Sequence, residues 1–166
     1  MAIRFKNGEE YYNKIYTLFN LSVAVTLLPF GYLVLEKHSG SLVSMPLDSW
    51  LLWSISLPSL AALGYLVYWS HQSFIADKAS AKTQPNLRAK LQAFHTLLLK
   101  RFLTYTGISG ACTLLLFITG SGLFIMAYVV TMILLSLSRP TLNLIIEALD
   151  LAEEEEKILI DKLDIQ

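Results

Sequence analysis

Four long runs of apolar residues in this sequence contain no Asp, Glu, Lys, Arg or His. A helix needs about 20 such residues to cross a hydrocarbon core about 30 Å thick. Only 16% of the 166 residues are charged, whereas soluble domains have about 25%. We therefore predict an all-α fold, a four-helix transmembrane bundle at 15–138 between an N-terminal arm, 1–14, and a tail, 139–166. The predicted spans are residues 15–35, 50–69, 102–119 and 122–137.

The last two runs are separated only by Gly120 and Ser121. The sequence TGSG at 119–122 combines residues that favour turns. We therefore predict a tight hairpin of two spans at this point instead of one long helix.

Basic residues are distributed unevenly among the segments between the runs. The arm, the loop 70–101 and the tail together hold twelve Lys and Arg, whereas the other two connections hold one, Lys37. Lys and Arg near span ends concentrate on the cytoplasmic side of membrane proteins. We therefore predict an integral protein of a bacterial inner membrane, with both termini and the loop 70–101 in the cytoplasm.

The loop 70–101 contains an amphipathic segment, with apolar residues at helical spacing at 87, 91, 94 and 98. Asn86 is suited to cap that helix. Such a helix either lies in the headgroup plane or extends the third span as a stalk, and the sequence leaves both alternatives open. We predict a basic cytosolic surface formed by Lys78, Lys82, Arg88, Lys90, Lys100 and Arg101.

The tail combines apolar stripes with a run of four glutamates at 153–156. Pro140 suits the first turn of one helix, and Asp150 with Glu153 suits the capping box of a second, acidic helix. An apolar stripe on so short a helix must be buried against something. We predict a docking element whose partner-binding residues are Leu142, Ile145, Ile146, Leu149, Glu153, Glu154, Ile158, Leu159 and Leu163.

Charge indicates what the tail docks on. Residues 139–166 have a net charge of −5, and the loop 70–101 has a net charge of +5. The cytoplasmic leaflet is usually negative and would repel the tail. We therefore expect a basic protein surface, either the loop of the same chain, the loop of a neighbouring copy or another protein. The apolar stripe would supply most of the stability, because exposed ion pairs contribute little.

Small and hydroxyl-bearing residues indicate how the spans pack. Gly107 and Ala111 form a small-xxx-small pair, with Gly110 beside it, and such pairs let membrane helices approach closely. We predict helix packing through these three residues, within the bundle or between subunits. The Ser and Thr hydroxyls of the spans fit hydrogen bonding between helices or to their own backbone, and they also suit the lining of a narrow pore.

The sequence contains no recognisable catalytic constellation. No spacing of His, Cys and carboxylate residues suggests a metal site. The lone cysteine, Cys112, lies in an apolar run, where we interpret it as a packing residue. We therefore predict no enzyme activity, no cofactor, no metal, no nucleic-acid partner and no small-molecule substrate.

The predicted external loops are short, whereas the predicted cytoplasmic side carries an amphipathic loop and a helical tail. This asymmetry favours a role in protein–protein interaction. We predict a non-enzymatic accessory, scaffold or assembly subunit of a larger membrane complex. Its partners would be membrane lipid and other membrane or cytosolic protein subunits, or copies of itself. The first alternative is a small homo-oligomeric channel or facilitator with hydroxyl-lined spans. The second is a lipid-modifying membrane enzyme that uses His71 and His95.

Overall fold

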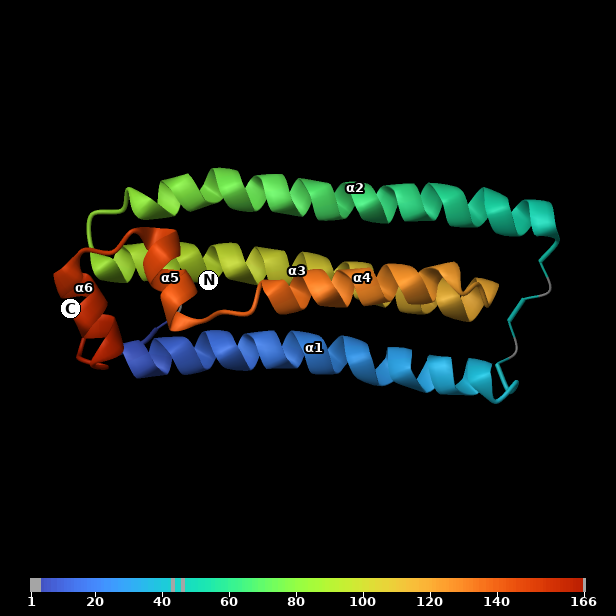
Figure 1. Ribbon diagram of the computed structural model, residues 1–166, viewed down its shortest axis with the longest axis horizontal. Helices are drawn as coiled ribbons and strands as arrows, with labels where there is room; N and C mark the ends of the chain where they lie inside the picture. Colours follow the sequence, from blue (N-terminus) through green and yellow to red (C-terminus); the bar gives the residue numbers. More distant parts are fainter. Residues whose placement is uncertain (1–3, 43, 46, 166) are drawn as a thin grey trace. The chain divides into compact units, whose positions relative to one another are not determined.

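The computed structural model describes residues 4–42, 44, 45 and 47–165 (Figure 1). These residues form α-helices and no β-strand, so the all-α prediction is confirmed. An isolated bridge pairs Asn7 with Asp164. The six helices of the described part are α1 (Gly8–His38), α2 (Ser49–Lys82), α3 (Leu87–Thr119), α4 (Leu123–Leu137), α5 (Leu142–Leu149) and α6 (Glu153–Ile160).

Three of these helices, α1, α2 and α3, are long and apolar enough to cross a membrane. α4 has 15 residues and meets the same test only together with α5, from which it is separated by a bent break. By length and composition, the described residues therefore contain three helices able to span a membrane, or four if α4 and α5 count as one span.

The predicted loop 70–101 is almost entirely helical. α2 continues past the predicted end of its span to Lys82, and α3 begins at Leu87. Pro85 explains the break between them, since a proline disfavours helical geometry in the residue before it. The amphipathic segment is therefore helically continuous with the predicted third span, as one of the two alternatives required. The Asn86 carbonyl accepts a hydrogen bond from Lys90 N at 3.0 Å, at the start of α3.

The turn predicted between the last two spans is present. α3 ends at Thr119 and α4 begins at Leu123. Gly120 has a φ of +61°, and its amide donates to Leu116 O at 2.8 Å, as is common for a glycine just after a helix. The Thr119 hydroxyl oxygen also accepts a hydrogen bond from the Ser121 amide at 3.2 Å. The helix break predicted from TGSG is therefore confirmed.

The chain divides into two compact units, each built from segments that are distant in the sequence. Unit 1 contains the chain up to Leu21, the stretch His71–Phe102 and the chain from Arg139 onward, and unit 2 contains Ser22–Ser70 and Leu103–Ser138. Every Lys and Arg except Lys37 belongs to unit 1, as does every Asp and Glu except Glu36 and Asp48. Unit 1 is therefore rich in charge and unit 2 is nearly free of it.

Unit 1 has an apolar core to which residues of five helices, α1, α2, α3, α5 and α6, contribute. Figure 1 shows α5 and α6 beside the beginnings of α1 and α3. The apolar face predicted for the start of α3 is buried at all four positions, because removing such a face from water is favourable. The largest fully buried side chains of this core are Tyr11, Ile15, Leu91, Phe94, Leu98, Phe102, Ile145 and Leu149.

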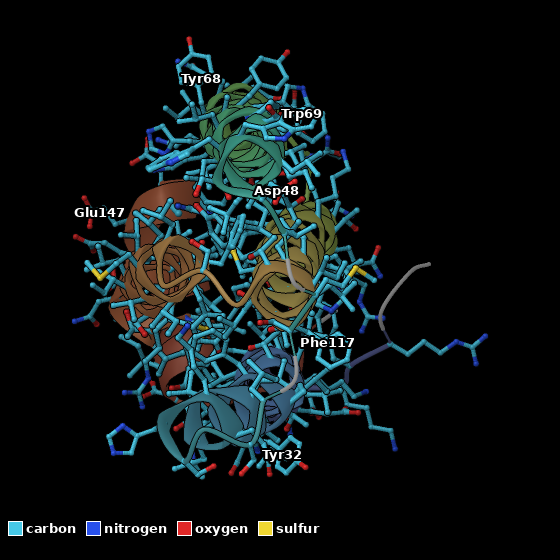
Figure 2. All side chains as sticks on the ribbon, turned by 90° about the vertical axis from the view of Figure 1, so that its right-hand side faces the viewer. Tyr32, Asp48, Tyr68, Trp69, Phe117 and Glu147 are labelled. Carbon is cyan, nitrogen blue, oxygen red and sulfur yellow. The ribbon has the colours of Figure 1, made fainter. Side chains whose placement is uncertain are left out.

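Unit 2 exposes more of its large apolar side chains than unit 1 does. Large apolar side chains are exposed on each of the four helices that enter it. The buried polar side chains of the described residues are all Ser or Thr, and all of them belong to unit 2. The exposed side chains include the rings labelled in Figure 2: Tyr32, Tyr68, Trp69 and Phe117.

The helix α5 begins later than predicted. Thr141 is its N-cap, and the Thr141 Oγ1 accepts a hydrogen bond from Leu144 N at 3.2 Å. Pro140 therefore precedes the cap, and its predicted place in the first turn of the helix was wrong. The hydroxyl of Thr141 can satisfy a free amide of the first turn, which proline cannot do.

The cap predicted for the acidic helix was also wrong. Asp150 has a left-handed conformation with a φ of 53° and ends α5, its amide donating to Ile146 O. Ala152 occupies the N-cap position of α6, and its amide donates to Glu155 Oε2 at 3.2 Å. Glu155, and not Glu153, therefore supplies the carboxylate that caps this helix.

Candidate interaction surface

The predicted docking element lies in unit 1 and is partly covered by its own chain. Ile145, Leu149 and Leu159 are 0%, 1% and 1% exposed, so they form part of the unit 1 core. The other six predicted partner-binding residues divide into two groups. Leu142, Ile146 and Ile158 are half-buried, whereas Glu153, Glu154 and Leu163 are exposed.

The first residue of α1 packs directly against the end of α6. A Cβ atom on Gly8 would lie 2.9 Å from the carbonyl oxygen of Leu159, so a larger residue would force the two helices apart. Nearby, the Ile165 amide donates to Lys6 O at 2.8 Å. The two ends of the described chain are therefore paired with each other.

Arg88 on α3 contacts both of these ends. Its Nη2 donates to Ile165 O at 2.6 Å and to Phe5 O at 3.4 Å. The guanidinium also lies 5.5 Å from the centroid of the Phe5 ring, within the range of a cation–π interaction. The Phe5 and Ile165 side chains are 3% and 4% exposed. The sequence reasoning missed both, because each is only a single apolar residue near one end of the chain.

Lys90 makes the charge contact between α3 and α6. Its Nζ lies 2.7 Å from Glu155 Oε2, and the two side chains are 15% and 20% exposed. Salt screens a partly buried pair of this kind less than an exposed one. The contact joins the basic and acidic segments within a single chain. Glu155 was not among the predicted partner-binding residues, because a glutamate run does not show which carboxylate faces inward.

The remaining residues of the predicted basic surface lie on α2 or contact it. Lys100 Nζ is 3.2 Å from Asp77 Oδ2, and the Arg101 guanidinium lies 4.4 Å from the centroid of the Phe74 ring. These contacts are separate from those that Arg88 and Lys90 make with the chain ends. Of the two residues on α2 itself, Lys82 is exposed and Lys78 is half-buried.

The outward side of α6 and the residues that follow it combine apolar and acidic side chains. Ile160 is 49% exposed and Leu163 is 52% exposed. Unit 1 has only two other large apolar residues exposed to this degree within the described chain, Leu21 and Ile75. We call this surface the α6 outer face. Its exposed acidic residues, Glu153, Glu154, Asp161 and Asp164, outnumber its exposed basic residues, Lys157 and Lys162.

Asn7 and Glu10 organise the start of α1. Asn7 Oδ1 accepts a hydrogen bond from Glu10 N at 2.9 Å, which is one half of a capping box, whereas Glu10 Oε2 accepts one from Lys6 N, the residue before the cap, at 2.8 Å. Lys14 Nζ lies 2.6 Å from Glu10 Oε1. The hydrogen bond from Lys14, followed by that from Lys6, lowers the pKa of the Glu10 carboxyl, which precedes the predicted span 15–35.

Tyr11 connects α1 to α3 in the centre of unit 1. Its hydroxyl donates to Leu91 O at 2.8 Å, and its side chain is 0% exposed. The Phe5 ring packs edge-on against it at a centroid distance of 5.0 Å. Tyr11 therefore supports the Phe5 ring against which Arg88 lies.

The two glycines predicted for helix packing in α3 make no close approach to other described residues of the chain. A Cβ atom on Gly107 or Gly110 would meet no described atom within 4 Å, and Ala111 is half-buried. These two glycines therefore do not mediate a tight helix crossing inside this chain. Packing through the three residues between subunits stays a prediction.

Unit 2 contains an apolar groove between α1 and α4 with a volume of about 760 Å³. The Phe30 and Tyr128 rings stack on each other in its wall, with centroids 3.5 Å apart. No charged side chain lines the groove. It is therefore suited to apolar material such as lipid chains and not to a charged substrate.

The residues considered for chemistry are dispersed. Among the described residues, no group of three or more His, Cys, Asp or Glu side chains is placed to hold a metal ion. Cys112 is fully buried, in agreement with a packing role. His71 is exposed on α2, and His95 is half-buried on α3.

The chain matched no protein-family model, no curated protein and no solved structure with which it was compared. What the protein does must therefore be inferred from its own geometry.

Proposed function

We propose that α1 to α4 cross a bacterial inner membrane and that unit 1 lies in the cytoplasm with both termini. The three segments that form unit 1 carry all Lys and Arg except Lys37. Cytoplasmic segments of membrane proteins are enriched in these residues. Segments that pack into one core must also lie on the same side of a membrane, so the unit 1 core independently supports this topology.

Aromatic residues on α2 support the placement of its span. Trp50 is 66% exposed at one end of the predicted span, and Trp69 is 51% exposed at the other. At a rise of about 1.5 Å per residue these two positions are about 28 Å apart along the helix. That separation suits aromatic belts on either side of a hydrocarbon core about 30 Å thick.

α4 is the shortest of the proposed spans. Its 15 residues extend about 22 Å, so the bilayer must thin locally or polar groups must reach to the interface from its ends. Arg139, just after α4, is suited to this. Its Nη2 donates to the Tyr16 hydroxyl at 3.1 Å, and its guanidinium lies 5.4 Å from the centroid of the Tyr16 ring.

Within this topology, we infer that the protein is a non-enzymatic accessory, scaffold or assembly subunit that binds another protein through the α6 outer face. The observation that carries this inference is the exposure of Ile160 and Leu163 beside four exposed acidic side chains. Exposed apolar side chains in an otherwise well-covered unit mark interaction sites. The fitting partner is a basic protein surface with an apolar patch, since opposite charge selects and orients the partner.

The test is native mass spectrometry of the full-length chain extracted from its membrane in nanodiscs. Loss of a stoichiometric partner from the double variant Ile160→Ala/Leu163→Ala would support the proposal. Ile75→Ala is the matched control, because Ile75 is 53% exposed in the same unit but lies on α2. Recovery of the wild-type chain without any partner protein, or of the double variant with its partner, would contradict it.

The channel alternative gains no support from the interior hydroxyls. Thr113 Oγ1 donates to Ser109 O at 2.8 Å, and Thr131 Oγ1 donates to Ala127 O at 2.8 Å. Both threonines are buried within the chain. Hydroxyls that bond their own helix backbone act as packing groups, so they are poorly placed to line a pore between subunits.

A further inference from the structure

Arg88 contacts both the N-terminal and the C-terminal segment of the described residues. Arg88 donates to the backbone carbonyl of Phe5 and to that of Ile165 through the same nitrogen. These acceptors are far apart in the sequence, and neither belongs to a helix. The Ile165 amide in turn donates to Lys6 O, so the ends also hold each other.

We propose that Arg88 is a latch that closes the N-terminal segment 4–8 and the C-terminal segment 159–165 onto α3, and that the two segments open together. Phe5, Leu159 and Ile165 are each less than 5% exposed in the closed state. Opening one segment removes a hydrogen bond or an apolar neighbour from the other. Release of either end therefore uncovers apolar side chains from both.

The chemistry of the contact suits a latch. The acceptors of Arg88 are neutral carbonyl oxygens, and hydrogen bonds to such groups are weaker than those to carboxylate or phosphate. The close approach of Gly8 to Leu159 O leaves little space between the two segments. The closed state therefore requires the guanidinium of Arg88 to reach both carbonyl oxygens at once. Removing that guanidinium should loosen both segments.

The latch would regulate access to the tail. Leu159 lies on α6 next to Ile160 of the outer face, so a partner that engages the tail would meet additional apolar side chains once the latch opens. Only this effect on partner access rests on the proposed function. The latch itself rests on the contacts between α3 and the chain ends, and its test needs no partner.

The experiment is hydrogen–deuterium exchange with mass spectrometry on the full-length protein in nanodiscs. Arg88→Gln is expected to speed amide exchange at least about tenfold (about 1.4 kcal/mol) in both 5–8 and 159–165, with little change in 91–102. Lys78→Gln, a neutralised basic residue on α2 of the same unit, is the matched control and should leave both segments unchanged. Faster exchange at only one end, or at neither, would overturn the latch.

Two further variants separate the latch from a general loosening of unit 1. Phe5→Leu keeps an apolar side chain but removes the ring beneath Arg88, and it should speed exchange at 159–165, in the opposite segment. Glu155→Gln weakens the pair with Lys90 and should loosen only the first turn of α6, residues 153–156, without opening 5–8 or 159–165. If Arg88→Gln unfolds unit 1 as a whole, an unchanged 159–165 segment in Phe5→Leu still contradicts the proposal. Equal opening of both ends by Glu155→Gln would also contradict it.

Discussion

Units 1 and 2 differ in what they expose. Unit 1 buries most of its large apolar side chains and exposes most of its charges, whereas unit 2 exposes many large apolar side chains and buries Ser and Thr along with apolar residues such as Phe124 and Leu135. In water, burial of apolar surface drives folding. Between helices in lipid that force is absent, and packing with hydrogen bonds between or within helices replaces it. This difference is the one expected if, as proposed, unit 2 lies in lipid and unit 1 in water.

The long helices serve both units. α1, α2 and α3 each contribute one part to unit 1 and another to unit 2. Along α3, residues 91, 94, 98 and 102 bury an apolar face in unit 1, while Leu103, Leu114 and Phe117 are exposed in unit 2. In the proposed topology, the boundary between water and lipid therefore falls within continuous helices, and matched substitutions in the two units can locate it.

The largest expected effect is on the unit 1 core. Phe94 is 0% exposed, so Phe94→Ala should lower the free energy of unfolding of unit 1 by about 3–5 kcal/mol. Leu28 is 73% exposed in unit 2, and Leu28→Ala should change stability by less than about 0.5 kcal/mol. Denaturant unfolding of the purified protein in detergent measures both. If Leu28→Ala lowered the free energy of unfolding as much as Phe94→Ala, the exterior of unit 2 would have to be packed against another surface.

A second prediction compares a lysine substitution at one exposed apolar residue of unit 2 with the same substitution in unit 1. Val130 in unit 2 and Ile75 in unit 1 are both 53% exposed. Val130→Lys should disfavour membrane insertion of α4 by about 2.5–3.5 kcal/mol, if the lysine falls near the helix centre in the bilayer. Ile75→Lys should be neutral, because water surrounds that position in the proposed topology. The inserted fraction of each variant in isolated membranes gives the comparison, and full insertion of Val130→Lys would place unit 2 outside the hydrocarbon.

The smallest predicted effect is a pH dependence confined to unit 1. Lys14 and the Lys6 amide lower the pKa of Glu10 below its ordinary value of 4.5. A lowered folded-state pKa stabilises the fold above the unfolded pKa, and this contribution is lost as the pH falls through the folded pKa. The unfolding midpoint of unit 1 should therefore fall slightly more steeply below about pH 4.5 in wild type than in Glu10→Gln. Identical profiles would show that the Glu10 network contributes nothing measurable.

Much of the local structure could be predicted from the sequence. Uncharged apolar runs indicated the long helices, TGSG indicated the break before α4, and the helical spacing of apolar residues indicated the buried face at the start of α3. These features depend on neighbouring residues, whose physical preferences act over one or two turns. The cap of α6 was misplaced because Asp150, Ala152 and Glu155 compete within a few residues, and only the end of α5 decides among them.

The sequence by itself determined the distribution of charge, the apolar runs and the opposite net charges of the loop and the tail. Only the tertiary structure decided that Lys90 meets Glu155, and that Arg88 bonds carbonyls 77 and 83 residues away. It also decided that Ile145 and Leu159 face the core while Leu163 faces outward. The physical reason is range: helix propensity and hydropathy act locally, whereas these contacts exist only when α1, α3, α5 and α6 have packed together.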